Sequence, residues 1–441
     1  MDRLPGIQFA FHRLKAILDL MRHVYLDHQA ATPLLPEAFE AMKPFFTEWF
    51  GNPSSLHEHG LRVREALKRS REQMAALIHA GSPDEIFFTS DGTESANLAI
   101  KGVAYANERR GKHLVVCATE HPSVINSVEF LEKQGWTCTR VGVDAEGRLR
   151  LHELKEAITP QTVLVAVHHV NHDIGTIQPV AEVGRICSDK GVPLYVDCEA
   201  SAGWLPIDVE AWGAALVSFS PHRFYGPKGV GVLYRNKKAR LVSIIHGGVQ
   251  EGGRRAGTEN VPAIVGAGVA AEVARMDLDA RIAHTRELQA RLWDGLEKHV
   301  GFIKLNGPRP GPDRISTNLN ISTEFIEGEG QLLLCDLNGI AVASGSSCVS
   351  KSLKISHVLA AIGLDHALAQ GNIIMTLGRD TSVEDVDYVV QTFVRIVEKL
   401  RGMSPMWDEF QRGIIDSVIR PTGRGKSFSQ HAADVSGKPA H

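Results

Sequence analysis

The sequence predicts an α/β protein in which helices flank a mostly parallel central sheet, together with a smaller α+β domain. Two observations support this fold class. From about residue 112, short apolar runs alternate with stretches of helical length, a pattern typical of parallel strands joined by helices. With 441 residues, the chain can bury a large core and is long enough for two domains.

The predicted strands are short and apolar. We expect them at residues 113–117, 163–167, 194–196 and 215–219. Helices are predicted at residues 122–134 and 179–190, and one long helical stretch at residues 271–299. Ligands of such sheets bind at the carboxyl ends of the strands, so the residues after these runs are candidates for chemistry.

Four parts are predicted along the chain. Residues 1–23 mix apolar and basic side chains without the apolar centre of a signal peptide, which favours a helical N-terminal extension. Residues 36–275 are predicted to form the large domain, and residues 24–35 with 276–418 the small one. Residues 419–441 have little to bury and are expected to form a disordered tail.

Composition excludes several classes of protein. The net charge of −3 gives no reason to expect nucleic acid or an anionic membrane as a partner, and no apolar stretch is long enough for a membrane span. The six cysteines include no C-x-x-C pair, which indicates a reducing, cytoplasmic setting rather than a disulfide framework. No spacing matches a recognised metal motif, so no metal site is predicted.

A series of short segments, in this order, resembles the cysteine desulfurases. The resemblance runs from about Val24 to about Arg412 and rests on these segments: 25–27 (YLD), 51–55 (GNPSS), 88–90 (FTS), 93–95 (TES), 119–121 (TEH), 169–171 (HVN), 196–197 (VD), 218–220 (SFS), 225–229 (YGPKG), 255–258 (RAGT) and 344–348 (SGSSC). It implies a fold-type I, class V aminotransferase-like protein that binds pyridoxal phosphate (PLP) and forms a homodimer.

The segment from Asp91 to Glu94 follows a predicted strand and opens a helix. Free N–H groups and the positive end of the helix dipole suit a phosphate there, although Asp91 and Glu94 also fit a plain capping box. The resemblance implies that the cofactor phosphate contacts Gly92, Thr93, Ser220, His222 and Thr258. Thr258 is expected to reach this site from the other subunit.

Three residues at predicted strand ends match the part of the pocket that holds the cofactor ring. The resemblance implies that Asp197 pairs with the pyridinium nitrogen, that His121 stacks on the ring, and that Asn171 lies at the ring hydroxyl. A satisfied buried Asp or His would look the same in isolation, but three matching strand ends favour a retained pocket.

Cys348 lies in a Ser/Gly-rich loop, which does not suit a strand or a helix core. The resemblance makes it the nucleophile that accepts sulfur and carries a persulfide. The other cysteines are predicted to be small core residues, except Cys198, which directly follows Asp197 and is expected to face the pocket.

Arg223 stands where the resemblance places the lysine that binds the cofactor. A Schiff base needs a neutral primary amine, whereas a guanidinium stays protonated and cannot attack an aldehyde or remove a proton from the substrate. Lys228 does not replace it, because relatives carry that lysine in addition to the catalytic one. Classical PLP chemistry on cysteine is therefore not expected.

Further pocket positions are altered. Ile374 stands where the resemblance places the arginine that holds the substrate carboxylate, and Ala200 where it places a glutamine at the ring hydroxyl. Asp91 adds a negative charge at the phosphate site. The other polar groups that the pocket gains relative to the resemblance are His28, His172, Asp173, Cys198 and Glu199.

Three hypotheses remain open. The leading one is a desulfurase-like protein that acts in sulfur transfer or iron–sulfur metabolism through Cys348, with a sulfur acceptor or scaffold protein as partner. The second is an enzyme that holds PLP non-covalently. The third is a non-catalytic homologue that binds a partner enzyme.

Overall fold

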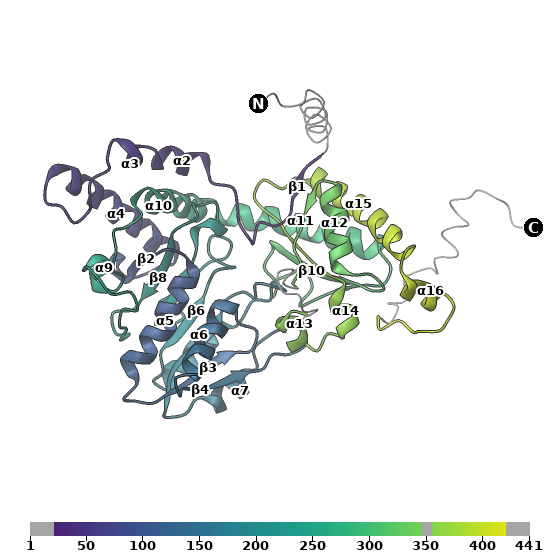
Figure 1. Ribbon diagram of the computed structural model, residues 1–441, viewed down its shortest axis with the longest axis horizontal. Coiled ribbons are helices and arrows are strands. Elements are labelled where there is room, and N and C mark those ends of the chain that lie inside the picture. The colour runs from purple at the N-terminus through teal and green to yellow at the C-terminus, as the bar shows by residue number, and fades with distance from the viewer. Residues whose placement is uncertain (1–21, 346–354, 420–441) are drawn as a thin grey trace, which may run out of the picture.

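The computed structural model describes residues 22–345 and 355–419. Figure 1 shows a large sheet with helices on both of its faces beside a smaller body that contains the strand β10. In the described part of the chain, no helix is long and apolar enough to cross a membrane. The α/β architecture predicted from the sequence is confirmed.

The large sheet has seven strands in the order β2-β8-β7-β6-β5-β3-β4. Strand β8 pairs antiparallel with both of its neighbours, and the other pairs are parallel. The bounds are β2 Ile86–Thr89, β3 His113–Cys117, β4 Thr137–Val141, β5 Thr162–His168, β6 Leu194–Asp197, β7 Leu216–Phe219 and β8 Gly231–Arg235. The four predicted strands therefore agree with β3, β5, β6 and β7 to within one residue at each end.

Both faces of this sheet are buried, which explains why its central strands are apolar at every position. Val115 and Cys117 belong to one core, while Leu114 and Val116, which alternate with them, belong to the other. Helices α4 (Glu58–Leu77), α7 (Leu151–Ala157), α8 (Val180–Asp189) and α10 (Val261–Met276) contribute to the first core, and α5 (Gly92–Asn107) and α6 (Pro122–Glu132) to the second. Shorter helices α2 (Pro36–Met42), α3 (Pro44–Thr47) and α9 (Gln250–Gly253) complete this body.

The prediction of one helical stretch at residues 271–299 is wrong. Helix α10 ends at Met276 and α11 (Leu278–His299) begins two residues later, because Asp277 leaves the helical conformation with φ −107° and ψ 12°. The Asp277 carboxylate pairs with Arg281 Nε in the first turn of α11 at 2.5 Å, where a negative charge suits the helix dipole.

The smaller body has an antiparallel sheet in the order β12-β10-β9, which packs against α11 and α15. A separate parallel pair, β1 with β11, joins the N-terminal segment to this body. The bounds are β1 Val24–Tyr25, β9 Ile303–Leu305, β10 Asn318–Thr323, β11 Ile340–Ala341, β12 Asn372–Thr376, α12 Gly328–Leu337, α13 His357–Ala361, α14 His366–Gln370, α15 Val383–Arg401 and α16 Pro405–Gln411.

The two bodies meet beside the carboxyl end of β5. Asn320 Nδ2 on β10 donates to Asp173 Oδ1 at 2.8 Å, and the Ile315 N–H donates to the Gly175 carbonyl at 2.9 Å. Three predictions fall almost wholly on residues outside the described ranges: the helical extension over residues 1–23, the tail over residues 419–441, and the loop that carries Cys348. Residues 22 and 23, which the structure does describe, are not helical.

Candidate active site

The candidate site lies where β3, β5 and β6 end, since these neighbouring parallel strands present their carboxyl ends at one edge of the sheet. Two small cavities, each of about 10 Å³, lie here. Their linings include these sequence-predicted residues: His28, His121, His172, Asp197, Glu199, Ala200 and Arg223. The structure therefore brings together residues that are far apart in the sequence.

His121 begins helix α6, where its Nδ1 accepts from the Ser123 backbone N–H at 3.2 Å. Burial and the nearby Arg223 charge lower the pKa of His121 to about 4. Its ring meets the His172 ring edge to face at 5.0 Å, and burial together with neighbouring histidines lowers the pKa of His172 well below its usual range. Both side chains are thus held as neutral imidazoles at pH 7.

Asn171 is placed at the site, but the amide is already engaged by the backbone. Its Nδ2 donates to the Thr119 carbonyl at 3.1 Å, and its Oδ1 accepts from the N–H groups of Asp173 and Ile174 at 2.9 and 3.0 Å. These bonds shape the turn after β5. In this structure, the side chain therefore acts as a turn-stabilising amide rather than a free contact for a ring hydroxyl.

Asp197 ends β6, and its two carboxylate oxygens differ in their contacts. Oδ1 accepts from the Glu199 N–H at 2.8 Å, while Oδ2 is buried and has no hydrogen-bond partner among the described residues. Burial, followed by the charges of Glu199 and Glu120, raises the pKa of Asp197 well above its usual range. A buried, unpaired carboxylate oxygen is costly, and it marks Asp197 as a group that a ligand would stabilise.

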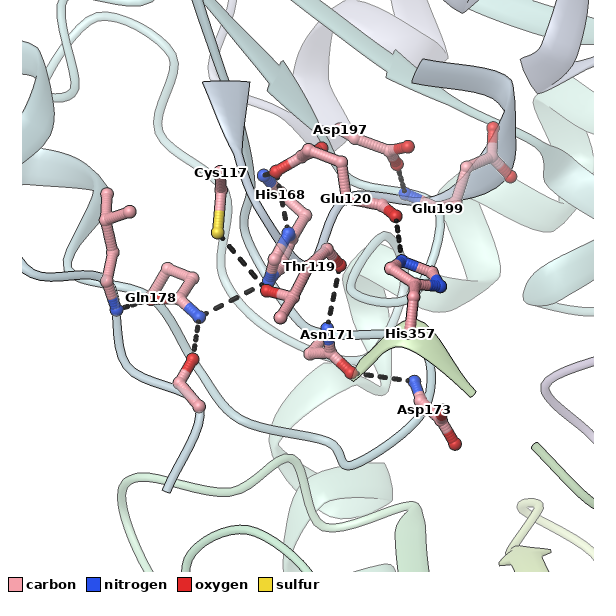
Figure 2. A network of polar contacts seen from close by, with 12 residues as sticks. Cys117, Thr119, Glu120, His168, Asn171, Asp173, Gln178, Asp197, Glu199 and His357 are labelled. Atoms are coloured by element: carbon pink, nitrogen blue, oxygen red, sulfur yellow. Dashed lines mark hydrogen bonds and ion pairs between the residues drawn. The ribbon is translucent and has the colours of Figure 1, made fainter. Parts of the chain in front are cut away.

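A polar network that was not predicted from the sequence lies beside Asp197 (Figure 2). Glu120 Oε1 accepts from the His168 backbone N–H and from His168 Nδ1, both at 2.7 Å. Gln178 Nε2 donates to His168 Nε2 at 3.3 Å, and His357 Nε2 donates to the Glu120 carbonyl at 2.9 Å. The sequence did contain a signal for this contact, since each of two neighbouring strands has a polar residue at or just after its end. That signal could have predicted the contact between Glu120 and His168.

The same network contains the group of described residues best spaced to hold a metal. Ligand atoms of Cys117, Glu120 and His168 lie within 4.8 Å of one another. However, burial and the Glu120 charge raise the pKa of the Cys117 thiol to about 12, and the His168 ring is engaged at both nitrogens. We interpret the group as a hydrogen-bond network, because a metal would have to displace these contacts and deprotonate the thiol.

At the start of helix α5, the capping contacts form as a reciprocal pair. Asp91 Oδ1 accepts from the Glu94 N–H at 2.7 Å, and Glu94 Oε2 accepts from the Ser90 N–H at 2.8 Å. Beside this cap, the Gly92 N–H donates to Ser220 Oγ at 2.8 Å, and Ser220 Oγ donates to Glu199 Oε1 at 3.0 Å. A carboxylate therefore lies at the position where the resemblance implies a phosphate.

Arg223 lies opposite the Glu199 carboxylate. It ends the short 3₁₀ turn Pro221–Arg223 after β7, and its carbonyl accepts from Trp204 Nε1 at 3.0 Å. Arg223 Nε lies 3.8 Å from Glu199 Oε2, is buried, and makes no hydrogen bond within the part of the chain that the structure describes. The guanidinium thus supplies a positive charge to a pocket that contains buried carboxylates.

The remaining predicted residues lie around this centre. His28 and His222 carry pKa values lowered to about 4, mainly by burial. Thr93 and Thr258 are exposed. Ile374 is buried within β12, and Ala200 lines both small cavities.

The expectation that Cys198 faces the pocket is wrong. Cys198 is fully buried in the apolar core between the sheet and its helices, and burial raises the pKa of its thiol well above the usual range. The turn after β6 instead directs Glu199 to the pocket, and in Figure 2 the Glu199 carboxylate points away from the Glu120–His168 network.

Known proteins share both the sequence and the fold. The aminotransferase class-V family matches residues 24–389. A cysteine desulfurase IscS of Dictyoglomus turgidum is 45% identical over 392 residues, which cover 89% of this chain and 99% of that protein. The chain belongs to the cysteine desulfurase family, within the class-V aminotransferases.

Two further relatives support this assignment. A cysteine desulfurase IscS of Methanosarcina thermophila is 43% identical over 87% of this chain and 94% of that protein. A solved NifS-like protein superposes with a TM-score of 0.81 at 35% identity, and the match covers 86% of this chain and all of that one. Cysteine desulfurases are PLP-dependent, so the pocket can be tested for its fit to that cofactor.

The pocket does not fit PLP in this structure. A cavity of about 10 Å³ has room for about one water molecule, far less than a pyridine ring with a phosphate needs. A larger cavity, of about 470 Å³, is lined by other residues, including Tyr25, Lys228 and Asp380, and not by His121 or Asp197. The position expected for the phosphate contains the Glu199 carboxylate, and no primary amine stands at position 223.

Proposed function

We propose that this protein acts in sulfur transfer as a desulfurase-like protein whose chemistry resides on Cys348 rather than on PLP. The observation that supports this most is the Arg223–Glu199 pair, at 3.8 Å, in the position where the family holds its cofactor. A guanidinium cannot form a Schiff base or accept a proton at neutral pH. Cysteine desulfuration by the family's usual route is therefore not expected here.

The residues that flank the Cys348 loop support a role beside this pocket. On one side, the Gly345 N–H donates to Asn372 Oδ1 at 2.9 Å. On the other side, Ser356 donates its hydroxyl to Asp173, and His357 contacts the Glu120 carbonyl. Both ends of the loop are thus fixed next to the candidate site, although Cys348 itself lies outside the described residues.

The proposed step transfers one sulfur atom without net oxidation or reduction. The Cys348 thiolate attacks the outer sulfur of a donor persulfide, so that a new S–S bond forms on Cys348. The donor's S–S bond breaks and the donor leaves as a thiolate. A sulfur-acceptor protein or an iron–sulfur scaffold would then take the outer sulfur in the same way.

The test is to supply a low-molecular-weight persulfide, remove the excess and measure cyanide-reactive sulfur. We expect about one transferable sulfur per chain in the wild type and almost none in Cys348→Ala. Cys138→Ala is the matched control, because burial raises the pKa of that thiol to about 12 and leaves it unreactive. Equal loading of wild type and Cys348→Ala would contradict the proposal.

The second hypothesis, a PLP enzyme with a non-covalent cofactor, has one observation in its favour. Asp197 Oδ2 is buried and no described residue bonds to it, as expected of a group that pairs with a pyridinium nitrogen. The small cavities and the position of Glu199 weigh against it. A titration of the wild type with PLP, followed by absorbance, separates the two hypotheses.

We also propose a cytoplasmic homodimer. Large apolar side chains on and near α2–α4 are exposed in the single chain, including Phe46, Phe50 and Leu56, and such a patch is typical of a protein interface. The described cysteines are all free, in agreement with a reducing compartment. Light scattering of the purified protein tests the dimer, and Phe50→Asp is expected to shift it towards monomer.

A further inference from the structure

The Glu199 carboxylate lies directly over the first residue of helix α5. Ser220 links the two, since it accepts from the Gly92 N–H and donates to Glu199 Oε1 at 2.8 and 3.0 Å. A Cβ atom on Gly92 would overlap Glu199 Oε1. The absence of a side chain at position 92 therefore gives the carboxylate its place at the helix end.

This location is one that suits an anion. Helix α5 is 16 residues long, and its N-terminus carries a partial positive charge that stabilises negative groups. Ser220 is 1% exposed, so its hydroxyl is committed to partners inside the protein. Together, the helix end and Ser220 form a small cup for one anionic group, which we call the anion cup.

Arg223 lies on the far side of the same carboxylate. Its Nε is 3.8 Å from Glu199 Oε2, and the side chains are only 21% and 12% exposed. Burial raises the pKa of Glu199, and Arg223 and Ser220 act against this shift. The other acidic groups that act on this centre are Asp91 and Asp197, which both disfavour a second negative charge.

We propose that Glu199 is a built-in anion that occupies the anion cup, is held there by Arg223, and excludes phosphate-bearing ligands from the pocket. The carboxylate takes the Ser220 hydroxyl contact that a phosphate would otherwise make, and Ser220 Oγ in turn occupies the Gly92 N–H. The Arg223 guanidinium lies in the adjacent space, and both side chains line the two small cavities of about 10 Å³. These two side chains therefore narrow the pocket.

Cys348 plays no part in the anion cup, although the sulfur-transfer proposal also draws on the Arg223–Glu199 pair. Sulfur loading of Cys348 is expected to be the same in the wild type and in Glu199 variants. Sulfur loading tests one proposal and PLP binding tests the other, so either can fail by itself.

The experiment measures equilibrium binding of two probes, PLP and pyridoxal, which lacks the phosphate. Glu199→Ala and Glu199→Ser empty the anion cup, whereas Glu199→Gln keeps it filled with a side chain of the same shape. We expect the wild type and Glu199→Gln to bind PLP weakly, and Glu199→Ala to bind it at least about tenfold more tightly. Pyridoxal binding is expected to change less than about twofold, because pyridoxal has no group for the cup.

Folding is checked by circular dichroism and thermal melting of each variant, and Glu199→Ser replaces Glu199→Ala if the latter does not fold. Glu156→Ala, an exposed glutamate on α7, is the surface control. Tight PLP binding by the wild type would overturn the proposal. So would an equal gain for PLP and pyridoxal, since the gain would then come from general opening of the pocket rather than from the anion cup.

Discussion

The two ends of the candidate pocket are built in different ways. The ring end, formed by His121, Asn171 and Asp197, keeps the residue types that the family resemblance implies, and its positions follow from the ends of three neighbouring strands. The anion end, formed by Gly92, Glu199, Ser220 and Arg223, contains a carboxylate and a guanidinium in contact with each other. The sheet determines where the residues of the ring end lie, whereas individual side chains determine the structure of the anion end.

The difference shows how one end of a family pocket can keep its residue types while the other end changes. At the ring end, neutral hydrogen bonds and buried neutral histidines maintain the local structure. At the anion end, opposite charges balance each other in a site with little water. The two ends should therefore respond differently to mutation and to pH.

The largest effect is expected from Arg223→Ala. This change leaves Glu199 and Asp197 in the pocket without the nearby cation, and removal of one partner from a buried charge pair is strongly destabilising. We expect a loss of about 3 kcal/mol in the free energy of unfolding, measured by urea denaturation. Arg185→Ala, at an exposed position on α8, is the control and should change stability little.

A smaller loss is expected at the ring end from His168→Ala. The change removes the side-chain donor to Glu120 and one of the two acceptors of Gln178 Nε2, which keeps the Gly147 carbonyl. Because buried polar groups lose hydrogen-bond partners, we expect a loss of about 2 kcal/mol in the free energy of unfolding, measured in the same urea experiment. Added zinc or a chelator should leave the melting temperature unchanged, and a rise with zinc would contradict the hydrogen-bond interpretation.

Glu199→Gln should have the smallest effect at neutral pH. Burial raises the pKa of Glu199 and Arg223 acts against this shift, so the Glu199 charge adds little net stability. Gln keeps the shape and an oxygen for Ser220, and Arg223 still lies near the charge of Asp197. We expect a change of less than about 1 kcal/mol in the free energy of unfolding. A loss as large as that of Arg223→Ala would mean that the charge pair, rather than Arg223 alone, stabilises this end.

Acidification should expose the difference between the two ends. The pKa of His121 is about 4 in the folded protein and near its ordinary value of 6.5 in the unfolded chain, so the unfolded state binds more protons between these values. Stability is therefore retained above pH 6.5 and falls as the pH drops towards 4. Glu199, whose pKa is raised, acts in the opposite direction, so the melting temperature of Glu199→Gln should fall more steeply than that of the wild type.

Much of this arrangement could be predicted from the sequence, because regular strands constrain their own ends. Apolar runs located β3, β5 and β6, and the residues after them lie at one edge of the sheet as expected. Turns carry no such periodicity, which is why Cys198 was expected in the pocket and Glu199 lies there instead. The break at Asp277 was missed because both flanking helices continue the same apolar pattern.

Contacts between distant segments were harder to predict. Glu120 and His168 are separated by 48 residues and meet only because β3 and β5 are neighbours in the sheet. The occupation of the anion cup depends on the side-chain orientation of Glu199, which the spacing of residues does not encode. The sequence indicated only that Glu199 is one of several polar groups added to the pocket.

The most direct test is the visible absorbance of the protein after saturation with PLP and desalting. The wild type should retain no cofactor, because Arg223 offers no amine and Glu199 occupies the anion cup. The double variant Arg223→Lys with Glu199→Ala should retain it, since both obstacles are removed. Cofactor retained by the wild type at a level equal to the double variant would contradict the account.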